Sequence, residues 1–201
     1  MAELERRILA VEGLRAERRE DGTAIITGHA AVFGQLSEDL GGFREQIAAG
    51  AFTESLQKDD IRAVWNHNDD IVLGRNRSKT LELAEDARGL AIRIYPPDTQ
   101  TVRDLVLAPI ERGDVSQMSF AFSVRPGGQD WAKNDDGQVI RTLKNLRTYE
   151  VSPVTFPAYP QTDVVIAQRS MKSYLEDLDA LTAEAWRAGI ALRRRRLALI
   201  S

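Results

Sequence analysis

Two residues of this sequence have the chemical types that serine-dependent acyl transfer requires. His67 lies in the segment Trp65–Asp69 (WNHND), and Ser119 lies in Met118–Val124 (MSFAFSV). A free hydroxyl is a weak nucleophile, so it needs a base to take its proton, and imidazole, with an ordinary pKa of about 6.5, suits this task near neutral pH. Only one other histidine, His29, is present. We interpret Ser119 and His67 as a candidate nucleophile and base, each at a strand edge and on a polar face.

A third residue commonly orients the imidazole, and it is commonly a carboxylate. Glu150 could supply this carboxylate from a later predicted strand, and Asp69, Asp70 and Asp114 are its rivals. Each residue type also has an ordinary explanation, because a serine between aromatic residues often only packs on a sheet and a histidine in an Asn- and Asp-rich turn often only faces solvent. Since no Gly-x-Ser-x-Gly segment is present, the residue pattern alone leaves a serine hydrolase as one of several interpretations.

Short apolar or alternating segments predict a protein rich in strands. The clearest is Leu90–Tyr95, in which the large apolar residues share one face. Further strands are expected at 24–33, 61–65, 71–73, 80–83, 118–124 and 139–151. Gly28 predicts a bend or bulge in the first of them, and the turn signal Asp21-Gly22 predicts that Leu4–Arg19 pairs with it as a hairpin.

Helical spacing of apolar residues is found in three places. Helices are expected at 51–57, 98–112 and 170–201. Asp98 or Thr99 is suited to cap the second helix, and Gly113 is suited to end it. Pro109 should kink or shorten this helix, because proline has no N–H group to donate to the preceding turn.

Many short strands with few helices indicate an α+β fold, built on a mostly antiparallel, barrel-like sheet flanked by helices. We expect one domain over residues 1–168 and a helical tail over residues 169–201. In the tail, apolar residues recur at helical spacing from Met171 to Trp186, and Arg193–Arg196 follow. The tail is interpreted either as a helix that packs on its own domain or on a second subunit, or as a removable docking segment that meets an acidic partner.

The composition argues against several classes of function. A formal net charge of −3 gives no bulk attraction to nucleic acid, and the absence of cysteine excludes disulfides and thiolate catalysis. No HExxH segment, P-loop or dinucleotide fingerprint is present, so we expect neither a metal nor a cofactor. No apolar run is long enough to span a membrane, and Met1–Val11 lacks the apolar region of a secretory signal, so we expect a protein without membrane association that is not secreted.

Six segments, in this order and at this spacing, resemble the phage prohead protease family. They are Gly28–Gly34 (GHAAVFG), Ile47–Phe52 (IAAGAF), Trp65–Gly74 (WNHNDDIVLG), Gly89-Leu90, Gly113–Phe122 (GDVSQMSFAF) and Tyr149–Pro160 (YEVSPVTFPAYP). The resemblance covers roughly residues 24–168. Each segment is short, and the specificity lies in the ordered set.

The resemblance implies a fold shared with herpesvirus assemblins, which is a mostly antiparallel β-barrel ringed by helices. Members of the family cleave capsid subunits, scaffolding segments and often themselves inside the immature capsid. The resemblance therefore implies a serine endopeptidase with Ser119 as nucleophile and His67 as general base. It also implies the major capsid protein or a scaffold segment as substrate, and a place inside the assembling prohead in the host cytoplasm. A homo-oligomer, a dimer or larger, is expected.

The sequence departs from the related proteins at several positions. Assemblins use a second histidine as the third catalytic residue, but no histidine follows Ser119, and Glu150 is the expected substitute. His29 stands where an aromatic residue is expected, which indicates a packing role, and Ala121 stands where family members often have glycine. Arg125 is considered for the oxyanion hole, directly or through water, although a solvated loop arginine is the favoured interpretation.

Two other functions compete with the protease. One is a catalytically silent capsid-assembly or scaffolding module with the same fold, and the other is a small β-barrel binding domain unrelated to phages. A scaffold has no need for His67, Ser119 and Glu150 together, and an unrelated barrel does not explain the ordered segments. Labelling by a serine-reactive phosphonate would separate the protease from both.

Overall fold

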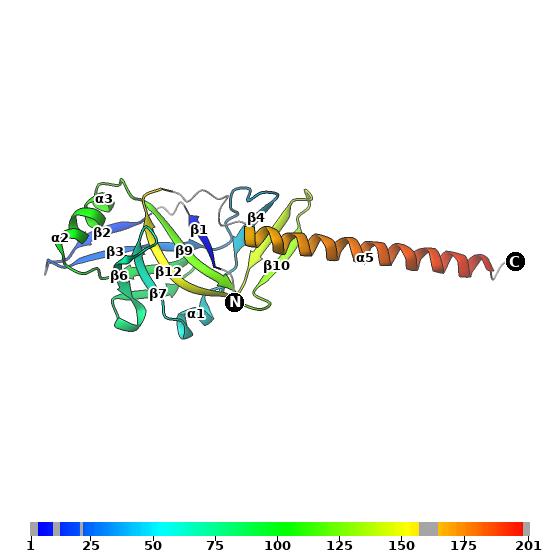
Figure 1. Cartoon of the computed structure of the whole chain (residues 1–201), viewed down its shortest axis with the longest axis horizontal. Coiled ribbons are helices and arrows are strands. Elements are labelled where there is room, and N and C mark those ends of the chain that lie inside the picture. Colours follow the sequence, from blue (N-terminus) through cyan, green and yellow to red (C-terminus); the bar gives the residue numbers. More distant parts are fainter. Residues whose placement is uncertain (1–3, 10–12, 21, 157–164, 199–201) are drawn as a thin grey trace. The chain divides into compact units, whose positions relative to one another are not determined.

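The computed structural model describes residues 4–9, 13–20, 22–156 and 165–198 of the chain (Figure 1). The chain divides into two compact units, residues 1–164 and residues 165–201. The first unit contains three β-sheets and a few short helices, and the second consists of the helix α5 (Val165–Ala198). The strand-rich α+β class predicted from the sequence is confirmed, and a helix occupies the predicted tail.

The first sheet has five strands in the order β1-β9-β12-β5-β6. Their bounds are β1 Glu5–Leu9, β9 Gln117–Val124, β12 Leu146–Val154, β5 Arg62–Trp65 and β6 Asn68–Arg75. Neighbouring strands are antiparallel except β12 and β5, which are parallel. Because β9 lies between β1 and β12, it is an inner strand, and all residues from Met118 to Ser123 are buried.

The second sheet is wholly antiparallel, with the strand order β2-β3-β8-β7. Its strands are β2 Arg15–Arg18, β3 Ala24–Val32, β8 Gly89–Ile94 and β7 Leu81–Glu85. Leu90, Ile92 and Ile94 are buried, as their alternation predicted. The irregularity expected in β3 is confirmed too, because the pairing with β8 shifts between His29 and Ala31.

The third sheet is small and has the strand order β10-β11-β4. Its strands are β10 Gln129–Lys133, β11 Val139–Leu143 and β4 Phe43–Ile47, the last two being parallel. Buried charges link this sheet to β1. Arg7 Nε donates to Glu45 over 2.8 Å, and Arg141 donates to Glu5 over 2.6 Å and to Glu45 over 2.8 Å. The two arginines and two glutamates form a buried cluster, here called the Glu5–Arg141 cluster, that fixes β1.

The helices of the first unit are short. They are α1 Thr53–Lys58, η1 Asn76–Ser78, α2 Gln100–Val102, η2 Arg103–Leu107 and α3 Ala108–Glu111. The Thr99 hydroxyl caps α2 by accepting from the Val102 N–H. In the wide π-helical turn η2, the Ala108 N–H donates to the Arg103 carbonyl. This wide turn immediately precedes Pro109, so the predicted disturbance takes the form of a π-turn.

Two expectations about the sheets need correction. A closed barrel requires every edge strand to pair with another, but the described strands form three separate sheets and no closed barrel. The N-terminal hairpin is correct only for β2, which pairs with β3, whereas β1 pairs with β9 in another sheet. Residues 157–164, which include the end of the Tyr149–Pro160 segment, and the side chains of Trp186 and Arg193–Arg196 lie outside the described part.

Candidate active site

His67 lies in a tight turn between β5 and β6. The turn has two central residues, Asn66 and His67, with φ values of 51° and 57°. Positive φ at both central positions is the geometry of a type I′ hairpin turn, which matches the twist of the two strands. Asparagine and histidine are among the non-glycine residues that adopt this backbone region most often, although it still costs about 1 kcal/mol or more. Such strain persists only where the surrounding contacts enforce it.

Those contacts come from the end of β12 and the residue that follows it. The Asn66 side chain donates to the Thr155 hydroxyl over 2.7 Å and accepts from the Thr155 N–H over 2.8 Å. The Asn66 N–H donates to the Pro153 carbonyl over 3.1 Å. The next N–H along the chain, that of His67, donates to the hydroxyl of the fully buried Ser152 over 3.0 Å. The position of His67 is therefore set by a strand that is distant in the sequence.

The imidazole of His67 contacts Glu150 directly. Nδ1 lies 2.5 Å from Glu150 Oε1, and the two side chains are only 16% and 12% exposed. If the carboxylate is ionised, Nδ1 carries the proton, and Nε2 is left with a free lone pair, which is the tautomer of a general base. Nε2 is buried and has no hydrogen-bond partner among the described residues. The pair is thus arranged to accept a proton at Nε2.

Ser119 lies on the same face of the first sheet as Glu150. Residues paired across antiparallel strands point to the same side, and residues two apart on one strand share a face. Ser119 is paired with Ser152, and Ala121 is paired with Glu150. Since Ser152 also binds the His67 N–H, Ser119 and His67 flank the same residue. The structure therefore brings the three predicted site residues to one sheet face.

The environment of Ser119 differs from the expectation. Ser119 is fully buried on an inner strand, so it does not lie at a strand edge. Its hydroxyl donates to the Arg7 carbonyl of β1 over 3.0 Å. Within the described part of the chain, no hydrogen bond joins Ser119 to His67. The alternation along Met118–Val124 could not predict this, because it carries no information on β1, which pairs with β9 along one edge.

The rival carboxylates lie elsewhere. Asp69 and Asp70 are exposed residues of β6, and Asp114 is an exposed residue that pairs with Arg112 over 3.0 Å. Of the described carboxylates, Glu150 is the one with a hydrogen bond to His67.

Arg125 is not placed to form an oxyanion hole. It follows the end of β9, six positions beyond Ser119 or about 20 Å along an extended chain. Its guanidinium donates to Asp59 over 2.6 Å. The structure thus shows an arginine in a salt bridge, where a solvated loop arginine was the favoured expectation.

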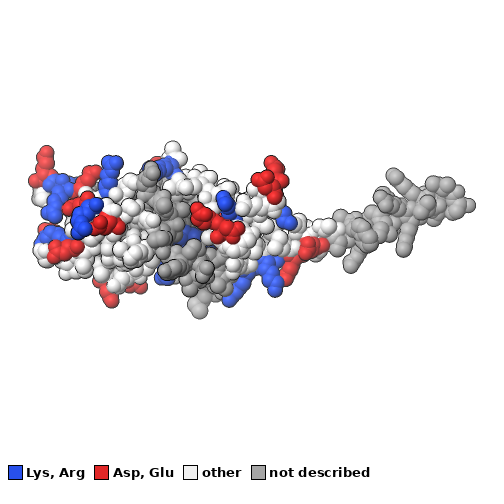
Figure 2. Space-filling model, turned by 90° about the horizontal axis from the view of Figure 1, so that it is seen from above, with Lys and Arg blue, Asp and Glu red and all other residues white. Residues whose placement is uncertain are grey.

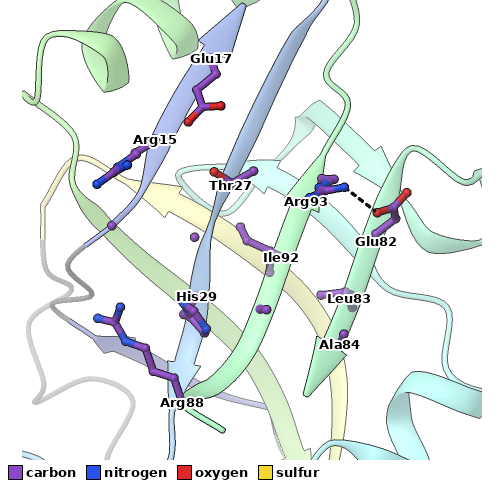
Figure 3. Close-up of a pocket in the computed structure, with 13 residues that line it drawn as sticks. Arg15, Glu17, Thr27, His29, Glu82, Leu83, Ala84, Arg88, Ile92 and Arg93 are labelled. Carbon is purple, nitrogen blue, oxygen red and sulfur yellow. Dashed lines mark ion pairs between the residues drawn. The ribbon is translucent and has the colours of Figure 1, made fainter. Parts of the chain in front are cut away.

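A concave region lies on the outer face of the second sheet, away from the candidate site. It is an open trough of about 570 Å³ that contains none of the three predicted site residues (Figure 3). At one end, His29 Nε2 lies 2.8 Å from Asp86 Oδ2. This hydrogen bond, with the N–H groups of Gly89 and Arg88, lowers the pKa of Asp86 to about 2. His29 therefore makes a hydrogen bond with Asp86, where a packing role was expected.

Two other kinds of feature are absent from the described part of the chain. It contains no group of three or more His, Asp or Glu side chains arranged to hold a metal ion. Within the described residues, no helix is both long and apolar enough to cross a lipid bilayer. On the face seen in Figure 2, acidic and basic side chains of the first unit are interspersed.

Comparison with known proteins gives the family. The family described as caudovirus prohead serine protease matches residues 12–177. None of the curated proteins matches the chain. A similar solved structure is that of the bacteriophage T4 capsid assembly protease, gp21, at 13% sequence identity and a TM-score of 0.40, with 75% of this chain and 98% of that chain covered. Because the family match extends over most of the chain, the chain belongs to the caudovirus prohead serine protease family.

Proposed function

We propose that the chain is a serine endopeptidase that cleaves capsid or scaffold proteins, and its own chain, while the prohead matures. The observation that carries the proposal is the His67–Glu150 contact of 2.5 Å. It leaves the buried Nε2 of His67, on the sheet face that holds Ser119, without a hydrogen-bond partner among the described residues. Membership of a prohead serine protease family supports the same reaction class.

The proposed reaction begins when the Ser119 hydroxyl turns from the Arg7 carbonyl to Nε2 of His67. The hydroxyl oxygen attacks a peptide carbonyl while Nε2 takes its proton, and Glu150 stabilises the resulting imidazolium. His67 then gives this proton to the leaving amine, and an ester forms between Ser119 and the acyl half of the substrate. Water, deprotonated by His67, attacks the ester, and the proton returns to Ser119 as the acid product leaves.

The hydrogen bond from Ser119 to Arg7 describes a resting state. A fully buried hydroxyl cannot meet a peptide, and its proton is already donated to the Arg7 carbonyl. We propose that the site opens when substrate is presented inside the assembling shell in the host cytoplasm, where the substrates are the major capsid protein or a scaffold segment. A homo-oligomer and the absence of nucleic-acid and membrane partners remain part of this proposal.

The same burial favours a second candidate, a catalytically silent assembly module. A serine that has no hydrogen bond to its base, in the described structure, is the arrangement expected of a site that has lost its activity. The contact of His67 with Glu150 argues for the protease, because a silent module has no need of an oriented imidazole.

Co-expression with the cognate capsid protein separates the two. Intact masses of the capsid subunit and of the chain itself are compared for the wild type, Ser119→Ala and the control Ser123→Ala, which removes a neighbouring buried hydroxyl of β9. Cleavage in the wild type and in Ser123→Ala, but not in Ser119→Ala, supports the protease. Full-length masses in all three samples, in particles that have assembled, support the silent module.

A further inference from the structure

Arg6 of β1 lies beside the carboxylate that contacts His67. It is paired with Ala121 of β9, which is itself paired with Glu150 of β12, so the three side chains share one face of the first sheet. Arg6 Nε lies 3.9 Å from Glu150 Oε1. The Arg6 side chain is 38% exposed, but its Nε atom is buried and has no hydrogen-bond partner among the described residues.

The charge of Glu150 has few other groups to compensate it. Its side chain is largely buried, it has one hydrogen bond, to His67, and its Oε2 is buried without a partner in the described part of the chain. A buried carboxylate with few hydrogen bonds is poorly solvated, and a positive charge close by offsets this cost. A carboxylate that is not held at this position would no longer fix the Nδ1 proton of His67.

We infer that Arg6 is a positioning residue of the active site, whose guanidinium holds the Glu150 carboxylate in place beside Nδ1 of His67. The inference rests on the proposed function, because it assigns Arg6 a role in the same Ser119–His67–Glu150 site. Arg6 touches neither the substrate nor the reacting atoms in this account, and it acts through Glu150 alone.

The other charged groups around Glu150 leave this role to Arg6. Arg62 is paired with Glu150 from β5, the neighbour of β12 on the side away from β9. Its side chain is 44% exposed, and its guanidinium lies 3.4 Å from Asp60. The facing residues of β9, Ser119 and Ala121, carry no charge, and the β5–β6 turn contributes only His67 itself. The acidic residues of β6, Asp69 and Asp70, are exposed to solvent, which screens their charge.

The test compares Arg6→Gln with Arg6→Lys and with the matched control Arg62→Gln, all in the full chain. The kinetic substrate is a peptide that spans the cut found in the co-expression experiment. Arg6→Gln is expected to lower kcat about tenfold with little change in KM, and to move the acid limb of the rate profile upward by about one pH unit. Arg6→Lys should keep most of the activity because it keeps the charge, and Arg62→Gln should resemble the wild type.

A second readout needs no activity. Nitrogen NMR of the imidazole rings distinguishes His67 from the only other histidine, His29, with His29→Gln as the assignment control. In the wild type, His67 should carry its proton on Nδ1. In Arg6→Gln, the double protonation of His67 should occur at higher pH, because a neighbouring positive charge has been removed. The position of this transition is read from the folded protein and requires no catalytic turnover.

Two results would overturn the inference. One is an unchanged acid limb and an unchanged His67 transition in Arg6→Gln, and the other is an Arg6→Lys variant as impaired as Arg6→Gln. If Ser119→Ala abolishes cleavage while Arg6→Gln behaves as wild type, only the role of Arg6 fails. If Ser119→Ala still cleaves, the proposed site fails, and the NMR comparison still decides whether Arg6 acts on the His67–Glu150 pair.

Discussion

The hydroxyl of Ser152 connects the backbone of His67 to the neighbouring strand. It accepts from the His67 N–H over 3.0 Å and donates to the Val64 carbonyl over 2.8 Å. Ser152 is fully buried and follows Glu150 by two positions on β12, so one short stretch of strand holds both the backbone and the imidazole of His67. The left-handed turn at His67 is kept in place by this double attachment.

Ser152→Ala should therefore impair catalysis as well as stability. The substitution leaves a buried carbonyl and the His67 N–H without their partner, which should lower the free energy of unfolding by about 1–3 kcal/mol. A displaced imidazole should lower kcat about tenfold or more with little change in KM. Urea denaturation and peptide-cleavage kinetics measure the two effects.

Ser123→Ala is the matched control, because its buried hydroxyl also has a hydrogen bond, to the Tyr149 hydroxyl over 3.1 Å. It should lose stability but keep its kcat. Equal kcat values in both variants would contradict a positioning role for Ser152.

The Glu5–Arg141 cluster makes a separate prediction about stability. Arg141 is 1% exposed and bonds to Glu5 and Glu45, and although burial raises the pKa of Glu5, the hydrogen bonds and charges of Arg141 and Arg7 lower it overall. Arg141→Met would leave two glutamates buried with less compensation, so the free energy of unfolding should fall by about 3–5 kcal/mol in urea denaturation. Lys144→Met, which removes an exposed pair with Asp130, should cost less than about 1 kcal/mol. Similar losses in both variants would show that the cluster does not fix β1.

Gly89 is required by the close approach of β8 to β3. A Cβ atom at this position would lie 2.0 Å from the Ala31 carbonyl oxygen, next to the irregular pairing of His29 and Ala31. Gly89→Ala should therefore force the strands apart and cost about 1–3 kcal/mol in a thermal or urea unfolding experiment. Gly28→Ala on β3, where the nearest atom would be 3.2 Å away, should cost less. The reverse order of the two losses would contradict the strand geometry described here.

The His29–Asp86 pair should contribute to stability in a defined pH range. The pKa of Asp86 is lowered from 3.8 to about 2, mainly by the hydrogen bond with His29. A carboxyl group whose pKa is lower in the folded state stabilises the fold above its unfolded pKa, and this stability is lost as the pH falls through the folded pKa. The difference in unfolding free energy between wild type and Asp86→Asn should therefore shrink from about pH 4 to about pH 2. A difference that stays constant over this range would contradict the assignment.

The sequence predicted elements well where one local signal sufficed. The alternation at Leu90–Tyr95 matches β8 because one face of that strand is buried, and Thr99 caps α2 because its hydroxyl reaches the N–H three residues on. The contact of His67 with Glu150 spans 83 positions, and the choice of Glu150 came from a family resemblance and its place on a later strand, without any measure of distance.

The sequence patterns did not predict which distant strands pair. Nothing in the N-terminal segment indicated that β1 would pair with β9, more than a hundred positions away, and this pairing accounts for the burial of Ser119 and the position of Arg6. For the same reason, the expectation of a barrel was wrong. Closure of a barrel depends on which edge strands pair, and local sequence patterns do not specify that pairing. The roles of Arg6 and Ser152 had no signal in the sequence beyond their places in charged and polar segments.

The nucleophile is tested most directly by labelling with a serine-reactive fluorophosphonate, followed by peptide mass mapping. The reaction should be carried out in assembling proheads under conditions in which cleavage is observed, so that the site is open. The account predicts a covalent adduct on Ser119 that stops cleavage and that does not form in His67→Ala. An adduct on another residue with loss of cleavage, or continued cleavage after complete labelling of Ser119, would contradict it.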